Sequence, residues 1–304
     1  MKKTTIKDIA KAAGVSIATV SYILNDVKTQ SISDETRVKV LKIAQQLKYV
    51  TNRTAQSLKI KKTGLIGILL FKEKEQSLWS DLKYVRTIFK IEQLCSQLGY
   101  HVLFMQIDST APSSKIIMER NLDGVFLINV DKEMFTTISH YFGFGIPIFV
   151  IDSYIEDNLF HKIMPNFEQS FRVLDDLFSQ SPQFLIMDGY NNAELVELIK
   201  EKSNLDEDRI HVYENKNELN IFLSKFSDRP GIVINEFLAN EVYRTHKNIM
   251  ALCTCHFPEI LSEEIVKIKF DLNDYKEIMH MMDSYMNEQD YVNPEKFFLL
   301  STIL

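Results

Sequence analysis

The stretch TIKDIAKAAGVSIATVSYILN, residues 5–25, contains two short apolar-periodic segments joined at Gly14. Gly14 suits a tight turn, because a left-handed backbone costs little only for glycine, and Ser16 is a natural N-cap for a second helix. The pattern predicts two closely packed helices with an outward row of Ile17, Ala18, Ser21 and Tyr22, which suits a DNA recognition helix. The apolar positions with helical spacing are Ile6, Ile9, Ala10 and Ala13, then Val15, Val20, Ile23 and Leu24.

A third helix is predicted to begin after Ser33, another N-cap residue, with Asp34 and Glu35 in its first turn. We expect its buried stripe to be formed by Val38, Leu41, Ala44 and Leu47. Residues 1–50 would then form a small helix-turn-helix domain. A three-helix bundle that contacts another protein is the alternative.

The charges favour nucleic acid. Residues 1–62 contain thirteen Lys and Arg against four Asp and Glu, a net charge of +9, while the remainder has 22 against 37, a net charge of −15. A basic segment beside an acidic one indicates a nucleic-acid-binding domain attached to a separate body. A protein-contact bundle would not require this asymmetry.

Composition places the chain among globular proteins. With 304 residues, 45% of them hydrophobic, it can form two or three cores. We expect neither a membrane span nor a secretory leader, because no run of eighteen apolar residues occurs and MKK is followed by polar residues. Three cysteines, Cys95, Cys253 and Cys255, are too few for a disulfide framework, so we expect a reducing cytosol.

After residue 62 the pattern alternates between apolar runs and amphipathic stretches such as 81–98. Alternation of this kind predicts parallel sheets built from βαβ units. Two such series indicate two doubly wound lobes, with a ligand site in the crevice outside the carboxyl ends of the strands. The runs are 64–71, 101–107, 124–130 and 147–152, then 184–189, 209–214, 231–236 and 249–255, with late strands at 265–270 and 297–304.

The first seventy residues resemble the lactose-repressor (LacI/GalR) family of bacterial transcription regulators. The resemblance is carried by TIKDIAKAAGVSIATVSYILN, by SDETRVKVLKIAQQLKYV, by NRTAQSL at 52–58 and by TGLIGILL at 63–70. It implies a cytoplasmic homodimer that binds a pseudo-palindromic operator in double-stranded DNA and regulates a metabolic, carbohydrate-related operon as a repressor. It also implies a periplasmic-binding-protein-like body that senses an effector.

The resemblance implies three DNA-binding groups. The segment 52–58 is too short to be a stable helix alone, so we expect it to fold only against a partner. In the family this hinge folds in the DNA minor groove, where a leucine kinks the duplex, and Leu58 matches that leucine. Base-reading positions match Ile17, Ala18 and Tyr22, phosphate-contacting positions match Thr5, Ser16, Thr19, Ser21, Asn25 and Asn52, and hinge positions match Asn52, Arg53, Ala55, Gln56 and Leu58.

Departures from the family pattern predict a different operator. Tyr22 replaces a common arginine, and Ile17 with Ala18 offers only apolar contacts, which suit thymine methyl groups. Thr51 stands where many relatives have proline. We therefore expect the hinge and DNA shape to contribute more of the specificity.

The resemblance also implies the layout of the body. Residues 51–62 would be the hinge and 63–304 the effector and dimerisation domain, with a first lobe of 63–154 and 266–289 and a second of 155–265 and 290–304. Several positions that bind the effector in the family carry other residues here. Asn166 replaces an aspartate, no arginine follows Gly189, and IMALCTCHF replaces the usual turn. The candidate effector residues are Trp79, Asp152, Asn166, Asn235 and Glu236.

Other chemistry is weakly signalled. No GxSxG, HExxH, P-loop or GxGxxG occurs, so we expect no enzyme and no cofactor. Cys253, Cys255 and His256 lack a second ligand pair, so no metal site is expected, and the methionines of 273–287 indicate core or dimer surface. The effector is a sugar, another metabolite or a protein corepressor, and a body serving only as a dimerisation or docking platform is the alternative. A solute-binding protein is disfavoured by the basic segment.

Overall fold

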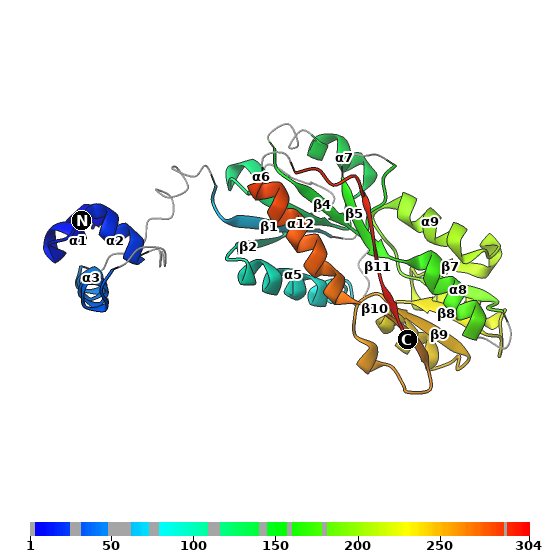
Figure 1. Cartoon of the computed structure of the whole chain (residues 1–304). Coiled ribbons are helices and arrows are strands. Elements are labelled where there is room, and N and C mark those ends of the chain that lie inside the picture. Colours follow the sequence, from blue (N-terminus) through cyan, green and yellow to red (C-terminus); the bar gives the residue numbers. More distant parts are fainter. Residues whose placement is uncertain are drawn as a thin grey trace. The chain divides into compact units, whose positions relative to one another are not determined.

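The computed structural model of the chain describes residues 4–24, 32–47, 62–72, 79–108, 116–139, 145–156, 160–177, 181–288 and 291–304. They belong to two compact units, which we call the head (Met1–Lys61) and the body (Lys62–Leu304) (Figure 1). Several positions predicted to bind DNA lie outside the described residues. These are Asn25, Asn52, Arg53, Ala55, Gln56 and Leu58.

Three helices form the described part of the head: α1 (Ile6–Ala13), α2 (Ile17–Leu24) and α3 (Asp34–Gln46). Each helix packs against the other two. Alanines at the helix contacts allow the close approach that so small a core needs. The fully buried residues of this core are Ile9, Ala10, Ala13, Val20, Ile23, Val40 and Ala44.

The predicted buried stripe of α3 is wrong for three of its four members. Val38, Leu41 and Leu47 are exposed, and the helix instead buries Val40 and Ala44. The α3 sequence contains two overlapping apolar stripes at helical spacing, and they point in different directions. The stripe that includes Val40 and Ala44 is the one that packs against α1 and α2.

The first lobe of the body is a six-stranded parallel sheet with strand order β11-β5-β4-β3-β1-β2. Alternate side chains of β1 point to opposite faces, so that Ile66 and Ile68 pack with α5 and α12 while Leu69 packs with α6 and α7. Both faces are therefore buried, as parallel sheets require. The bounds are β1 (Leu65–Phe71), β2 (His101–Ile107), β3 (Gly124–Ile128), β4 (Ile148–Ile151), β5 (His161–Pro165), β11 (Phe297–Leu300), α5 (Val85–Gln97), α6 (Ile116–Glu119), α7 (Lys132–Ser139) and α12 (Tyr275–Asn287).

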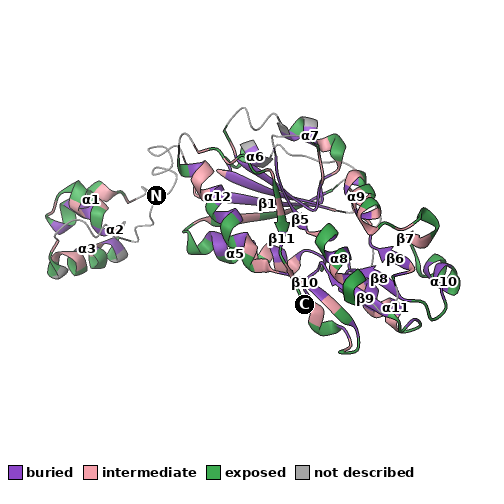
Figure 2. Cartoon of the chain, turned by 45° about the vertical axis from the view of Figure 1, so that its right-hand side comes forward, coloured by how far each residue is buried: buried purple, intermediate pink, exposed green. Residues whose placement is uncertain are grey.

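The second lobe repeats this plan with strand order β12-β10-β9-β8-β6-β7. Helices α8 and α9 cover one face and α10 and α11 the other, and Figure 2 shows the strands buried between the exposed outer sides of the helices. Among described strands, only β12 pairs antiparallel, with β10. The bounds are α8 (Phe167–Leu177), β6 (Phe184–Met187), α9 (Ala193–Ser203), β7 (Ile210–Val212), α10 (Lys216–Ser224), β8 (Gly231–Ile234), α11 (Glu236–Tyr243), β9 (Ile249–Cys253), β10 (Val266–Phe270) and β12 (Thr302–Ile303).

The α/β class with a helix-turn-helix head and two doubly wound lobes is confirmed. The expected lobe boundaries differ from those observed. Residues 161–165 were assigned to the second lobe without a strand, but they form β5, which pairs with β4 in the first lobe, while β10 was expected in the first lobe and pairs with β9 in the second. The run 297–304 was expected as one late strand, but it breaks at Ser301, so that β11 joins the first sheet and β12 the second. These are crossover segments, and only their hydrogen-bond partners decide the lobe to which each belongs.

The methionines of α12 lie in the core. Met279, Met281, Met282 and Met286 are buried, and an added Cβ at Gly124 would lie 2.7 Å from the sulfur of Met282. Unbranched thioether side chains fill the irregular space between this helix and the sheet. Of the two roles that the sequence suggested, these four side chains take the core one.

Within the described ranges, no helix is both long and apolar enough to cross a lipid bilayer.

Gly231 explains how β8 passes beneath an aromatic ring. Its partner in β6 is Phe184, and an added Cβ would lie 2.1 to 2.4 Å from three atoms of that ring. We expect Gly231→Ala to lower the free energy of unfolding by about 1–3 kcal/mol, the usual cost of overpacking a core. Gly189→Ala is the matched control, because a Cβ added there would have no neighbouring side chain or backbone within 4 Å, and denaturant titration of both variants measures the difference. Equal stability of the two variants would contradict the account.

Candidate nucleic-acid interface and interlobe crevice

The turn between α1 and α2 is built from backbone hydrogen bonds. Gly14 has a φ of 67°, the left-handed conformation that glycine adopts cheaply, and the N–H of Val15 donates to the carbonyl of Ala10 (3.1 Å). Ser16 then begins α2, because its Oγ accepts a hydrogen bond from the N–H of Thr19 (3.0 Å). Thr5 caps α1, with its N–H donating to the carboxylate of Asp8 (2.8 Å). The second helix is thereby held at a fixed angle to the first.

One face of α2 presents the predicted base-reading residues to solvent. Ile17 is 49% exposed and Tyr22 is 37% exposed, and Ala18 between them is also exposed. The opposite face buries Val20 and Ile23. A helix of eight residues with a buried apolar side and a short outward row can be laid into a DNA major groove.

The remaining predicted phosphate-contacting residues of the head lie near the beginning of α1 or on α2. Thr5 and Ser16 are exposed, and Thr19 and Ser21 are half-buried. Hydroxyl groups at helix N-termini are suited to phosphate oxygens, which backbone N–H groups and the helix dipole also attract.

In the body, the strand ends at the crevice carry Asn or Asp residues with positive φ. Asn129 follows β3 with a φ of 60°, Asp152 follows β4 with 50°, and Asn235 follows β8 with 77°. These residue types tolerate such a conformation better than other non-glycine residues. All three side chains are buried, so the crevice is lined by polar groups that water does not reach freely.

Three residues from the two lobes, Trp79, Lys83 and Asn235, surround the carboxylate of Asp188, which follows β6. Its Oδ2 accepts hydrogen bonds from Nε1 of Trp79 (3.0 Å) and Nδ2 of Asn235 (3.2 Å), and lies 3.4 Å from Nζ of Lys83. Trp79 and Lys83 come from the first lobe, while Asp188 and Asn235 belong to the second. The structure thus brings together two of the predicted effector residues and adds two charged residues that the prediction omitted.

The segment after Asp188 is hydrogen-bonded to the first lobe. Nδ2 of Asn191 donates to the carbonyls of Lys72 (2.8 Å) and Asn129 (3.0 Å), and its N–H donates to Oδ1 of Asn129 (2.9 Å). Oδ1 of Asn192 accepts from the N–H of Tyr154 (3.0 Å). This segment, expected to lack a ligand-binding arginine, fastens the two lobes to each other.

Asp152 and Glu236 are buried carboxyl groups. Burial raises the pKa of Asp152 to about 6, and the positive charge of Lys83 opposes that rise. Burial also raises the pKa of Glu236, against the effect of the N–H groups of Cys255 (2.9 Å) and Phe257 (2.6 Å), which donate to it. Glu236 is therefore engaged in holding the turn after β9.

Asn166 lies apart from the other predicted effector residues. Its Oδ1 accepts from the N–H of Gln169 (3.0 Å), so it caps α8. It lines a separate cavity of about 150 Å³, between α8, α9 and β11, with Tyr154 and Phe297. Nothing in the sequence pattern separates Asn166 from the crevice, because strand β5 before it was not predicted.

Lys83 and Asp188 were missed for different reasons. Lys83 precedes α5 and lies in the amphipathic stretch 81–98, where the pattern gave no signal for a buried charge. Asp188 lies at the carboxyl end of the predicted run 184–189, directly after the observed strand β6, and the rule that ligand-binding groups lie at the carboxyl ends of parallel strands could have found it.

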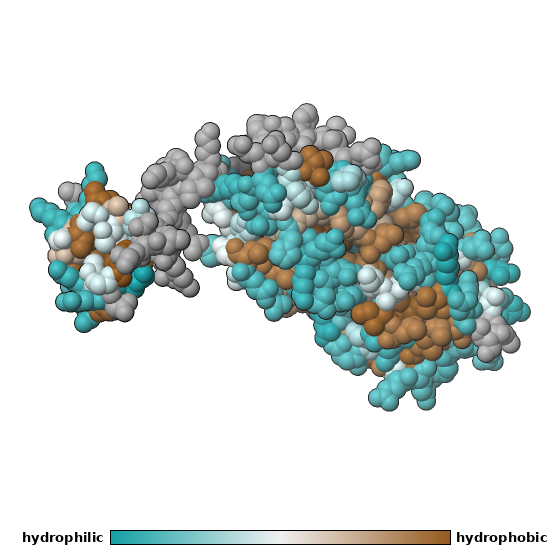
Figure 3. Space-filling model, in the orientation of Figure 1, coloured by the Kyte–Doolittle hydropathy of each residue, from teal (hydrophilic) through white to brown (hydrophobic). Residues whose placement is uncertain are grey.

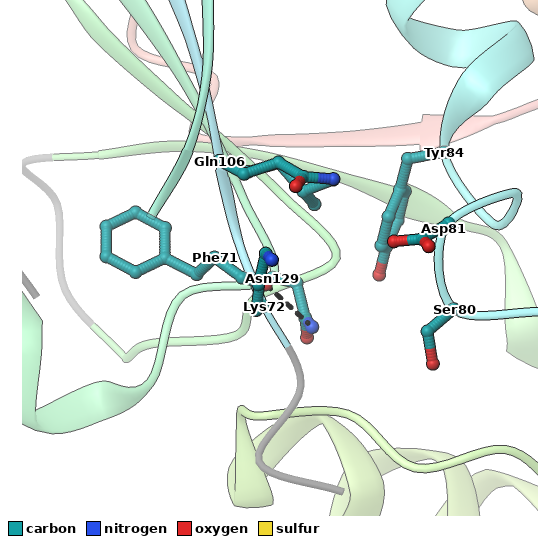
Figure 4. Close-up of a pocket in the computed structure, with 8 residues that line it drawn as sticks. Phe71, Lys72, Ser80, Asp81, Tyr84, Gln106 and Asn129 are labelled. Atoms are coloured by element: carbon teal, nitrogen blue, oxygen red, sulfur yellow. Dashed lines mark hydrogen bonds between the residues drawn. The ribbon is translucent and has the colours of Figure 1, made fainter. Parts of the chain in front are cut away.

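A small cavity lies at the first-lobe side of the crevice (Figure 4). Its volume is about 20 Å³, and Tyr84, Asp81 and Ser80 face Asn129 and Lys72 across it. Such a space holds about one water molecule, whereas pockets for small ligands measure about 300–1,000 Å³. No group of His, Cys, Asp and Glu suited to a metal ion occurs among the described residues.

Comparison with known proteins identifies relatives of both units. Residues 5–52 match the family of bacterial regulatory proteins called the lacI family. The chain is 35% identical over 125 residues to the HTH-type transcriptional regulator GalR of Lacticaseibacillus casei, covering 41% of this chain and 35% of that protein. It is 28% identical over 171 residues to the HTH-type transcriptional repressor PurR of Photobacterium profundum, covering 54% and 48%. The match thus spans about half or less of these relatives' length.

The fold of the whole chain also has a solved counterpart. The crystal structure of the lac repressor dimer bound to operator and the anti-inducer ONPF matches 100% of this chain and 98% of that one, with a TM-score of 0.72 and 17% identity. At this identity, the likeness concerns the fold.

The raised pKa of Asp152 has a measurable consequence. Its folded-state pKa of about 6 exceeds the ordinary value of 3.8, so the folded protein binds this proton more tightly and stability falls as pH rises from about 4 to about 6. Asp152→Asn removes the buried charge, and a difference of about two pKa units predicts a gain of roughly 2–3 kcal/mol at pH 7.5 and little change near pH 4. Thermal melts at both pH values measure the effect.

Asn129 shows that asparagine fits this kind of backbone, whereas Asp152→Ala would place alanine at a φ of 50° and should gain less. A loss of stability in Asp152→Asn at pH 7.5 would mean that the attraction to Lys83 exceeds the cost of burial.

Proposed function

We propose, on the premise that this chain belongs to the lacI family of bacterial regulatory proteins, that it is a sequence-specific DNA-binding repressor of a metabolic operon. The observation that carries the proposal is the outward row of Ile17, Ala18 and Tyr22 on α2, within a head whose sequence is strongly basic. A regulator of this kind works where the bacterial DNA is, in the cytoplasm and at the nucleoid, and needs no catalytic residues.

The outward row favours particular bases. Ile17 and Ala18 offer methyl and methylene surface, which suits the thymine methyl group, and the Tyr22 hydroxyl can donate or accept one hydrogen bond. Thr5, Ser16, Thr19 and Ser21 would contact phosphates and set the register on the duplex. Asn25 and the hinge residues Asn52, Arg53, Ala55, Gln56 and Leu58 would extend the contact, with Leu58 in the minor groove.

A homodimer is supported by apolar surface on the first lobe. Phe104 on the edge strand β2 is 44% exposed, and Phe89 on α5 is 67% exposed. Figure 3 shows apolar surface in this part of the body. Exposed apolar residues beside an unpaired strand edge favour association of a second copy, which would place two heads on a pseudo-palindromic operator as in the lac repressor complex.

The body would control DNA binding by setting how the two subunits of the dimer are arranged. An effector, either a sugar-like metabolite or a protein corepressor, would change lobe closure and thereby the spacing of the hinge segments 51–62. A second candidate role is a platform for dimerisation or protein docking without a small-molecule effector. The crevice supports the platform, because polar groups of the two lobes are already hydrogen-bonded across it, Trp79 to Asp188 and Asn191 to Asn129.

Selection of bound duplexes from random DNA tests the proposal directly. We expect recovery of a palindromic sequence rich in A·T steps at the positions facing Ile17 and Ala18. Binding to that sequence should weaken by roughly a thousandfold when salt rises from about 50 to about 200 mM, as expected for about six phosphate contacts. Recovery of unrelated sequences, or a flat salt response, would exclude a sequence-specific repressor.

Substitutions in the head separate DNA contact from stability. We expect Ile17→Ala or Tyr22→Ala to weaken operator binding by roughly 1–3 kcal/mol, while the exposed positions leave the folding of the head nearly unchanged. Val38→Ala on α3 is the matched control, because Val38 is also 49% exposed and lies outside the proposed contact row. Fluorescence anisotropy with labelled operator measures affinity, and equal losses for Ile17→Ala and Val38→Ala would contradict the assigned face.

A further inference from the structure

A single turn before α5 carries two buried side chains in the same direction. The N–H groups of Leu82 (2.8 Å) and Lys83 (3.1 Å) both donate to the carbonyl of Trp79. Residues four apart in such a turn lie on the same side, so the side chains of Trp79 and Lys83 project together. Both are almost fully buried, at 6% and 2% exposure, although the turn belongs to the first lobe and precedes its helix.

The indole of Trp79 packs in the core of the second lobe. It belongs to the same apolar cluster as Phe184 and Val233 of the sheet and Leu219 of α10, on the sheet face covered by α10 and α11. Its ring centre is 5.1 Å from that of Tyr213, and its Nε1 donates to Asp188. A first-lobe aromatic residue therefore fills a second-lobe pocket and satisfies the polar group at its edge.

The ammonium group of Lys83 also contacts the second lobe. Nζ donates to the carbonyl of Gly189 (2.8 Å), lies 3.4 Å from Oδ2 of Asp188 and sits 3.9 Å from the centre of the Tyr190 ring. A buried carboxylate, a carbonyl oxygen and an aromatic face are the groups that stabilise a cation removed from water. Moving the lobes apart would leave Asp188 without this counter-charge.

We propose that Trp79 and Lys83 form an intramolecular ligand that occupies the interlobe crevice and holds the lobes closed with no effector bound. A molecule entering the crevice there would meet the indole in the apolar second-lobe pocket and the oxygen of Asp188 already shared by Trp79, Lys83 and Asn235. A neutral sugar cannot replace an ammonium group beside a buried carboxylate, because the carboxylate would be left unpaired. The closed arrangement is thus a property of the chain, and sugars do not switch it.

The consequence for regulation rests on the proposed function: operator binding would be constitutive with respect to sugars. The latch formed by Trp79 and Lys83 can itself be measured without DNA. Trp79 is the single tryptophan of the chain, so intrinsic fluorescence reports directly on it. In the full-length, ligand-free protein we expect a blue-shifted emission, weak quenching by acrylamide, and no change on titration with glucose, galactose, ribose and cellobiose.

Substitutions test whether Lys83 holds the indole in place. Lys83→Met keeps the length of the side chain and removes its charge, and we expect a red-shifted emission with a several-fold larger acrylamide quenching constant. Asp188→Asn in the same background removes the unpaired charge while keeping an acceptor for the indole N–H, and should restore most of the protection. Lys132→Met is the matched control, because Lys132 forms an exposed ion pair with Glu194 between the same lobes and should change quenching little.

The outcomes separate the two proposals. A solvent-exposed Trp79 in the wild type, a sugar-induced shift, or equal quenching of Lys83→Met and Lys132→Met would overturn the latch. The wild-type measurements need no variant, so they decide the question even if Lys83→Met fails to fold. Operator binding measured on the same samples tests the repressor independently: its absence with a protected Trp79 would overturn the proposed function and leave the latch standing.

Discussion

An ammonium group taken out of water must find a counter-charge and acceptors nearby, and this requirement organises the body of the protein. Lys83 meets it mainly across the crevice, at Asp188, Gly189 and Tyr190, so separating the lobes would remove these three partners and leave the charge of Asp152 in its own lobe. The hydrogen bonds of Asn191 to Lys72 and Asn129 also join the two lobes and stabilise their closed arrangement. The polar ends of the strands, which in such folds are free to bind a ligand, are here bonded to each other.

The head is stabilised in a different way from the body. Its core is small and made largely of alanine, valine and isoleucine, and its charge balance is opposite to that of the rest of the chain. The head can fold with few contacts because Gly14, Ser16 and Ser33 fix the helix ends through local hydrogen bonds. Its exposed residues are therefore available for contact with DNA at little cost in stability, whereas the body uses its polar residues to hold itself together.

Sequence periodicity sufficed for the class of fold and for the outward row of α2, because glycine, N-caps and apolar spacing act locally. It failed for β5, because the polar residues His161 and Lys162 are buried in that strand and break the apolar pattern that predicts one. It failed for α3, because two apolar stripes at helical spacing overlap in the sequence. The candidate site shows the same limit. Trp79 was singled out, but its burial in the opposite lobe and its pairing with Asp188 depend on contacts between residues far apart in the chain.

The break at Ser301 links the two sheets through one short segment. Residues 297–300 form the edge strand of the first sheet and residues 302–303 that of the second, and both follow every other described strand in the chain. Neither sheet can be completed before this segment is available, so the two lobes should reach their final structure in one concerted, late step of folding. Contacts of such large sequence separation slow folding, and removing these few residues would make the buried strand β5 of the first sheet and β10 of the second sheet into edge strands at once.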